Sequence, residues 1–106
     1  MNEFDLSIEK TDAGVVIRIS GDLDMAVSPT LRDAFYKLYD ERPARIIVNL
    51  QGVTMMDSSG IAVLIEALRY CRKKKTGLAL ASPSAPVKKV LELAKLDEGV
   101  FEILNP

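Results

Sequence analysis

The chain has 106 residues with one cysteine and no histidine, and its 14 basic and 15 acidic side chains leave a net charge of −1. Without histidine, a serine or cysteine nucleophile has no imidazole base and zinc has no imidazole ligand, so we expect neither a histidine-dependent catalytic triad nor a zinc site built from histidine and cysteine. No metal and no cofactor are expected. Charge balance, the lack of an apolar run of roughly 20 residues and the lack of a leader-like start predict one cytoplasmic domain over residues 1–106, with no affinity for nucleic acid or membranes.

The first half of the chain combines strand periodicity with helix periodicity. Apolar and polar residues alternate over residues 4–9 and again over 15–19, across a four-residue turn, which predicts an antiparallel hairpin. The segment Gly-Asp-Leu-Asp at 21–24 follows the second strand. Ser28 offers a capping hydroxyl, and the apolar spacing after it predicts an amphipathic helix that closes before Pro43.

The second half alternates strands and helices. Ile46–Leu50 is a β-branched run typical of a central strand, residues 60–73 carry one apolar helical face, and residues 78–81 form a short apolar run. A third helix is expected after residues 82–86, and residues 100–104 fit either a strand or a terminal helix. This order predicts an α/β fold with a mixed, mainly parallel sheet and helices chiefly on one face.

The joint between the central strand and the second helix reads Asp57-Ser58-Ser59-Gly60. Any of the first three residues could cap the helix. A helix N-terminus at the carboxyl end of a central strand is also where α/β proteins place functional groups, and where a phosphate is electrostatically stabilised. One hydroxyl could therefore serve as the cap while its neighbour is modified or contacts a ligand, and both readings stay open.

Two other features favour structural roles. Residues 69–75 carry five cations at the end of the second helix, which the helix dipole favours, and Cys71 continues the apolar face of that helix. The Lys-Thr-Gly at 75–77 has the wrong order for a phosphate-binding loop.

Together, "VVIRISGDLD" and "RIIVNLQGVTMMDSSGIAVLIEALR" resemble the STAS domain, and specifically the anti-sigma factor antagonists of bacteria. The resemblance covers nearly the whole chain. It implies a regulatory protein, not an enzyme, which in its unphosphorylated form binds an anti-sigma factor that is also a serine kinase and so releases the sigma factor. Phosphorylation of the first serine of the motif, here Ser58, would abolish binding, and a phosphoserine phosphatase would restore it.

The resemblance further implies which residues contact the partner, with Ser59 as the better candidate for the helix cap. This set is Gly21, Asp22, Asp24, Asp57, Ser58, Ser59 and Gly60. Three rival functions remain from the sequence: a STAS subunit of a lipid-transport or stress-signalling complex, a small nucleotide-binding module that uses the helix N-terminus, and a hydrolase that pairs a serine with a lysine.

Overall fold

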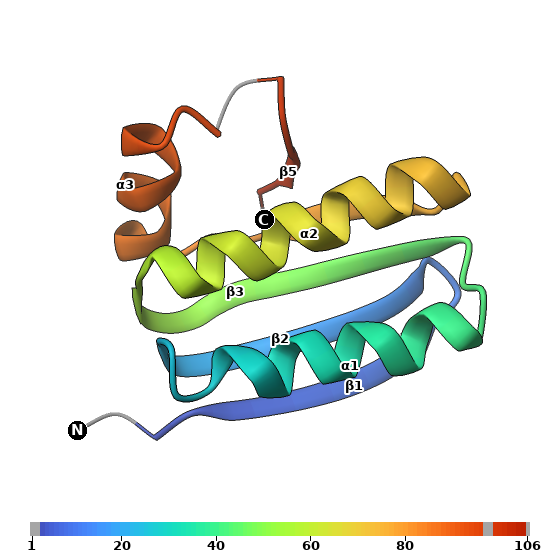
Figure 1. Ribbon diagram of the computed structural model, residues 1–106, viewed down its shortest axis with the longest axis horizontal. Coiled ribbons are helices and arrows are strands. Elements are labelled where there is room, and N and C mark those ends of the chain that lie inside the picture. Colours follow the sequence, from blue (N-terminus) through green and yellow to red (C-terminus); the bar gives the residue numbers. More distant parts are fainter. Residues whose placement is uncertain (1–2, 97–98, 106) are drawn as a thin grey trace.

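The structure, a computed structural model, describes residues 3–96 and 99–105; of the expected domain over 1–106, the other five positions lie outside the described part. Its elements follow one another in the order β1 (Asp5–Thr11), β2 (Gly14–Leu23), α1 (Ser28–Asp40), β3 (Arg45–Met56), α2 (Ser58–Lys74), β4 (Gly77–Ala81), α3 (Ala85–Leu93) and β5 (Glu102–Leu104) (Figure 1).

The five strands form one mixed sheet in the order β1-β2-β3-β4-β5. The β1–β2 pair is an antiparallel hairpin, with Ile8 opposite Ile17, and the three other pairs are parallel. Parallel neighbours need crossover connections, and the helices supply them. The carboxyl ends of β2 and β3 therefore lie at the same edge of the sheet.

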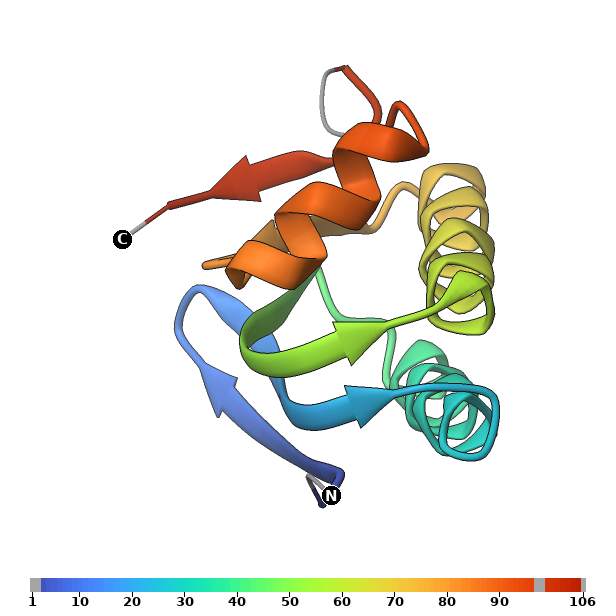
Figure 2. The ribbon, with the colours of Figure 1, turned by 90° about the vertical axis from the view of Figure 1, so that its left-hand side faces the viewer.

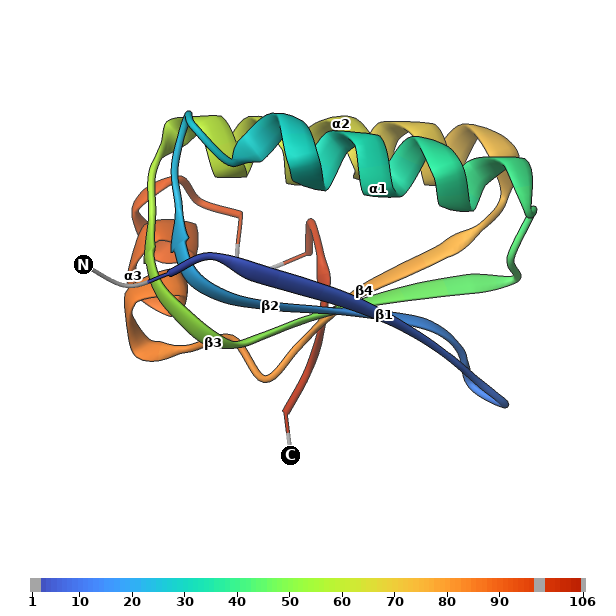
Figure 3. The ribbon, with the colours of Figure 1, turned by 90° about the horizontal axis from the view of Figure 1, so that it is seen from below.

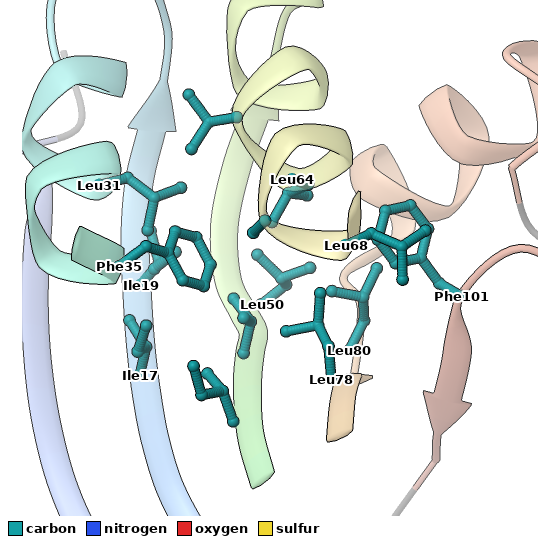
Figure 4. Packing of buried hydrophobic residues seen from close by; sticks show 14 of the residues in the cluster. Ile17, Ile19, Leu31, Phe35, Leu50, Leu64, Leu68, Leu78, Leu80 and Phe101 are labelled. Carbon is teal, nitrogen blue, oxygen red and sulfur yellow. The ribbon is translucent and has the colours of Figure 1, made fainter. Parts of the chain in front are cut away.

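Two helices cover one face of this sheet. Helices α1 and α2 run side by side over it, whereas α3 lies at the end where β3 curls away (Figures 2 and 3). The core between the sheet and the helices α1 and α2 is apolar, because β2 and β3 direct large side chains such as Ile17 and Leu50 toward the helices (Figure 4). From the helix side, Phe35 of α1 and Leu64 of α2 fill the space, and both are almost fully buried.

The fold class predicted from the sequence is confirmed: a single α/β domain with a hairpin at one side of a mainly parallel sheet and helices chiefly on one face. The C-terminal segment left open between strand and helix contains the strand β5. One detail was wrong. Ser28 does not cap α1, because Val27 is the N-cap residue and makes no side-chain bond, while Ser28 is itself buried in the first turn.

Candidate functional site

Two loops meet where β2 and β3 end. Leu23 and Met56 are register partners at the last position of the parallel ladder. The backbone N–H of Asp57 then donates to the carbonyl of Leu23, with 3.2 Å between N and O. This bond holds the loop that follows β2 against the start of α2, so Asp24 and Ser58 lie at the same end of the domain although 34 positions separate them in sequence (58 − 24).

The cap of α2 is a carboxylate. Asp57 has an extended backbone and its Oδ1 accepts from the N–H groups of Ser59 at 2.9 Å and Gly60 at 3.4 Å. The Ser59 hydroxyl donates to the same oxygen at 2.5 Å. The expectation that Ser59 was the better candidate for the cap was therefore wrong. The Ser59 hydroxyl instead donates to the Asp57 carboxylate, and this bond holds the carboxylate where it accepts from the backbone N–H groups.

These contacts stabilise the ionised form of Asp57. The Ser59 hydroxyl is the main cause that lowers the pKa of this carboxyl group below its usual value; slight burial opposes the shift, and the backbone amides of Ser59, Gly60 and Met25 add to it. Asp57 is therefore charged at neutral pH. The negative charge of Asp57 also lies next to the positive, N-terminal end of the α2 dipole, which stabilises the anion.

Ser58 differs from its neighbours. It is the first residue of α2 and is exposed to solvent. Asp57 and Ser59 are both engaged in the cap, whereas no hydrogen bond of the Ser58 hydroxyl occurs within residues 3–96 and 99–105. A hydroxyl at this position can be reached from outside, and a phosphate attached to it would lie at the N-terminus of a 17-residue helix.

The two glycines of the expected site are buried, and close packing explains them. A Cβ at Gly21 would lie 2.1 Å from the carbonyl oxygen of Glu3, and the backbone φ of +88° also favours glycine. A Cβ at Gly60 would lie 2.8 Å from the side chain of Met56 and 2.9 Å from Leu23. Both glycines thus allow the segments around the site to approach one another, and their contact with a partner stays a prediction.

The two aspartates of the Gly-Asp-Leu-Asp segment have different local partners. Asp22 accepts from the Thr54 hydroxyl at 2.7 Å, which links β2 to β3. Asp24 accepts from the backbone N–H of Ala26 at 3.0 Å and shapes the turn before α1. Only Asp24 lies in the loop that faces the start of α2. Asp22 lies in β2 itself, and its side chain is connected to β3 by the hydrogen bond from Thr54.

Met25 belongs to this region and was not found from the sequence. Its side chain is 75% exposed, the most exposed large apolar side chain of this loop, and it follows Asp24 directly. Met55, on the strand that leads into the motif, is also partly exposed. A methionine within an acidic turn is a signal that could have been used, because an exposed flexible apolar side chain is frequent at binding surfaces.

No group of three or more metal-binding side chains occurs in the described residues. None of the helices in that same part of the chain has the length and apolar character needed to cross a bilayer. Cys71 is buried in the core as expected, and burial raises the pKa of its thiol to about 11.

Comparison with known proteins gives one consistent family. Residues 5–105 match the STAS domain. An anti-sigma F factor antagonist of Paenibacillus polymyxa is 26% identical over 85% of this chain and 74% of its own length. An anti-sigma-B factor antagonist of Staphylococcus aureus is 25% identical over 88% of both chains.

Solved structures agree with this. An anti-sigma factor antagonist from Mycobacterium paratuberculosis shares the fold, with a TM-score of 0.87 at 22% identity over 96% of this chain and 86% of its own. The anti-sigma factor antagonist SpoIIAA in its unphosphorylated form has a TM-score of 0.78 at 25% identity, with 96% and 88% covered. The phosphorylated form of Bacillus SpoIIAA has a TM-score of 0.75 at 25% identity, with 98% and 91% covered.

Proposed function

This chain belongs to the STAS domain family, and on that premise we propose that it is a cytoplasmic anti-sigma factor antagonist whose binding is switched off by phosphorylation of Ser58. The proposal rests on one observation: the hydroxyl groups of the two adjacent serines have different surroundings. Ser59 is bonded to the Asp57 cap, whereas Ser58 stands exposed at the first position of α2. The relatives named anti-sigma factor antagonists, and the existence of SpoIIAA in two phosphorylation states, support it.

The partner surface in this proposal comprises the exposed and half-buried residues around Ser58. Asp24 and Asp57 contribute charge, and Met25 offers an apolar side chain that a partner would remove from water. Burial of a large apolar side chain at an interface supplies binding energy, while the carboxylates select a partner with cationic groups. A phosphate on Ser58 adds about −1.5 to −2 charges beside Asp57, which an interface built for a neutral hydroxyl does not compensate.

The partner is an anti-sigma factor that is also a serine kinase, and a phosphoserine phosphatase returns the chain to its binding form. The test compares Ser58→Ala with Ser58→Asp by titration calorimetry against such a kinase from the same genome. We expect Ser58→Ala to bind like the unmodified chain and Ser58→Asp to bind about 100-fold more weakly, the effect of an uncompensated charge that costs about 3 kcal/mol.

A phosphorylation assay gives the matched control. The kinase should label the unmodified chain and Ser59→Ala but not Ser58→Ala. Equal affinities of the two Ser58 variants, or label that persists in Ser58→Ala, would remove Ser58 from the switch. The motif would then be a helix start whose cap is Asp57, and a STAS subunit of a transport or stress-signalling complex would become the better reading.

A further inference from the structure

A cavity of about 690 Å³ lies at the opposite end of the domain from Ser58. It opens between the last turns of α1 and α2 and the chain that leads into β3. Its lining includes Tyr39, Asp40, Arg42, Tyr70, Lys74 and Lys75. Since α2 runs the length of the domain, roughly 24 Å separates this cavity from the Ser58 end. The volume lies within the range of small-molecule sites in proteins, about 300–1,000 Å³.

Three cations surround the cavity without local partners. Arg42, Lys74 and Lys75 form no ion pair within the part of the chain that the structure describes. Glu41, the neighbour of Arg42, is bonded instead to Lys10 of β1. Asp40 is the one carboxylate in the lining. The cations therefore leave an excess of positive charge around the opening.

The helix dipoles explain part of this arrangement, because cations are favoured at helix C-termini. They do not explain which backbone positions carry the cations. Arg42 and Lys75 both have left-handed backbones, with φ of 51° and 59°, where glycine is the least strained residue. The chain thus places a long cationic residue at each of two turns that favour glycine, and both residues belong to the lining of the same cavity.

Carbonyl groups at the C-terminal ends of α1 and α2 accept backbone hydrogen bonds from the residues that follow the helices. The carbonyls of Leu38 and Tyr39 accept from the N–H groups of Glu41 and Arg42, and those of Cys71 and Arg72 accept from Thr76 and Lys75. These bonds use acceptors that would otherwise repel an anion.

The cavity also has an aromatic wall. Tyr39 and Tyr70 stack with ring centroids 3.8 Å apart and planes at 16°, and both side chains are half-buried. The stack joins α1 to α2 beside the cations. Both residues belong to the lining, so the cavity combines aromatic residues with cationic residues.

We propose that this cavity binds a small organic phosphate, with its phosphate groups held by Arg42, Lys74 and Lys75 and its organic part against Tyr39 and Tyr70. The site is separate from Ser58 and does not depend on the function proposed above. It also differs from the nucleotide site considered from the sequence, which used the N-terminus of the helix that begins at Ser58.

Tyrosine fluorescence provides a direct assay, since the chain has three tyrosines and no tryptophan, and two of the three line the cavity. The probes are adenosine 5′-triphosphate and inorganic triphosphate, added to the full chain at low salt. We expect saturable binding of both probes. Arg42→Gly and Lys75→Gly should each weaken binding about tenfold, as expected for loss of a charged hydrogen bond. Both glycines fit the left-handed backbone, so these variants should remain folded in thermal unfolding.

Lys95→Gly is the matched control. Lys95 has the same left-handed backbone, with φ of 58°, after α3, and is absent from the cavity lining. Its replacement should leave binding unchanged. Tyr70→Leu should weaken adenosine triphosphate more than inorganic triphosphate. Absence of saturable binding would overturn the proposal, and so would equal losses in all three glycine variants or unchanged binding in Arg42→Gly and Lys75→Gly.

Discussion

At the scale of single residues, Asp57 determines how its neighbours are used. Its carboxylate accepts from the backbone of Ser59 and Gly60 and from the Ser59 hydroxyl. Because one oxygen satisfies these donors, Ser58 is not needed for the cap. The aspartate therefore allows a serine at the first position of α2 to be modified without loss of the structure that presents it.

Asp57→Ala should lower the free energy of unfolding by about 1 kcal/mol at pH 7, or roughly 4–8 °C in Tm, because the helix loses its cap. The pKa of Asp57 is lowered in the folded state, so this contribution is complete above the unfolded pKa of about 4 and is lost as the pH falls through the lower folded value. Thermal unfolding followed by circular dichroism from pH 7 to pH 2.5 should show the difference from the unmodified chain shrink in acid.

Ser58→Ala is the control for this measurement, since it changes the adjacent residue but removes no contact of the cap. It should cost less than half as much as Asp57→Ala at pH 7. If the two variants lose equal stability, or if the Asp57→Ala difference does not depend on pH, Asp57 is not the residue that stabilises the helix start.

At the scale of elements, apolar periodicity was sufficient to predict the three helices and the strands β1 to β4. The segment that contains β5 was left open between a strand and a helix. The ends of the elements were harder. Strand β3 continues past Leu50 to Met56, where Gln51 and Gly52 interrupt the apolar pattern. Backbone pairing with β2 maintains the strand there, across two register shifts that the sequence does not reveal.

The candidate site, too, was predicted from the sequence only in part. Its position at the end of a central strand followed from the pattern. The identity of the cap did not, because Asp57, Ser58 and Ser59 all satisfy the same local rule and only the backbone conformation distinguishes them. The methionine within an acidic turn was a usable signal for Met25 that was not used, and its degree of exposure depends on how the loop folds over its neighbours.

Helix α2 also provides a prediction on packing. Leu64 is fully buried between α2 and the sheet (Figure 4). Leu64→Ala should therefore lower the free energy of unfolding by about 2–5 kcal/mol, through lost burial and the cavity left behind. Leu93, at the end of α3, is 76% exposed, and Leu93→Ala should change it by less than about 0.5 kcal/mol. Urea denaturation measures both, and similar losses would contradict the packing described here.

At the scale of the whole molecule, the chain separates its charges although they nearly cancel. Asp24 and Asp57 lie at one end of α1 and α2, and Arg42, Lys74 and Lys75 lie at the other end (Figure 1). A net charge of −1 is therefore compatible with two carboxylates beside Ser58 and with three cations and one carboxylate, Asp40, around the cavity. The acidic end suits a partner with cationic groups, and the basic end suits an anion, so the two proposed sites need not compete.

A switch of this kind should act without refolding the domain. A negative group at position 58 gains about 0.3–1 kcal/mol from the α2 dipole, and repulsion from Asp57 offsets part of that gain. Ser58→Asp and the phosphorylated chain should therefore unfold within about 1 kcal/mol of the unmodified chain, measured by urea denaturation. Hydrogen exchange in the core strands β2 and β3 should also be unchanged. A loss of several kcal/mol, or exchange that spreads into these strands, would mean that phosphorylation acts by unfolding the domain, and the interface around Ser58 would no longer explain the loss of binding.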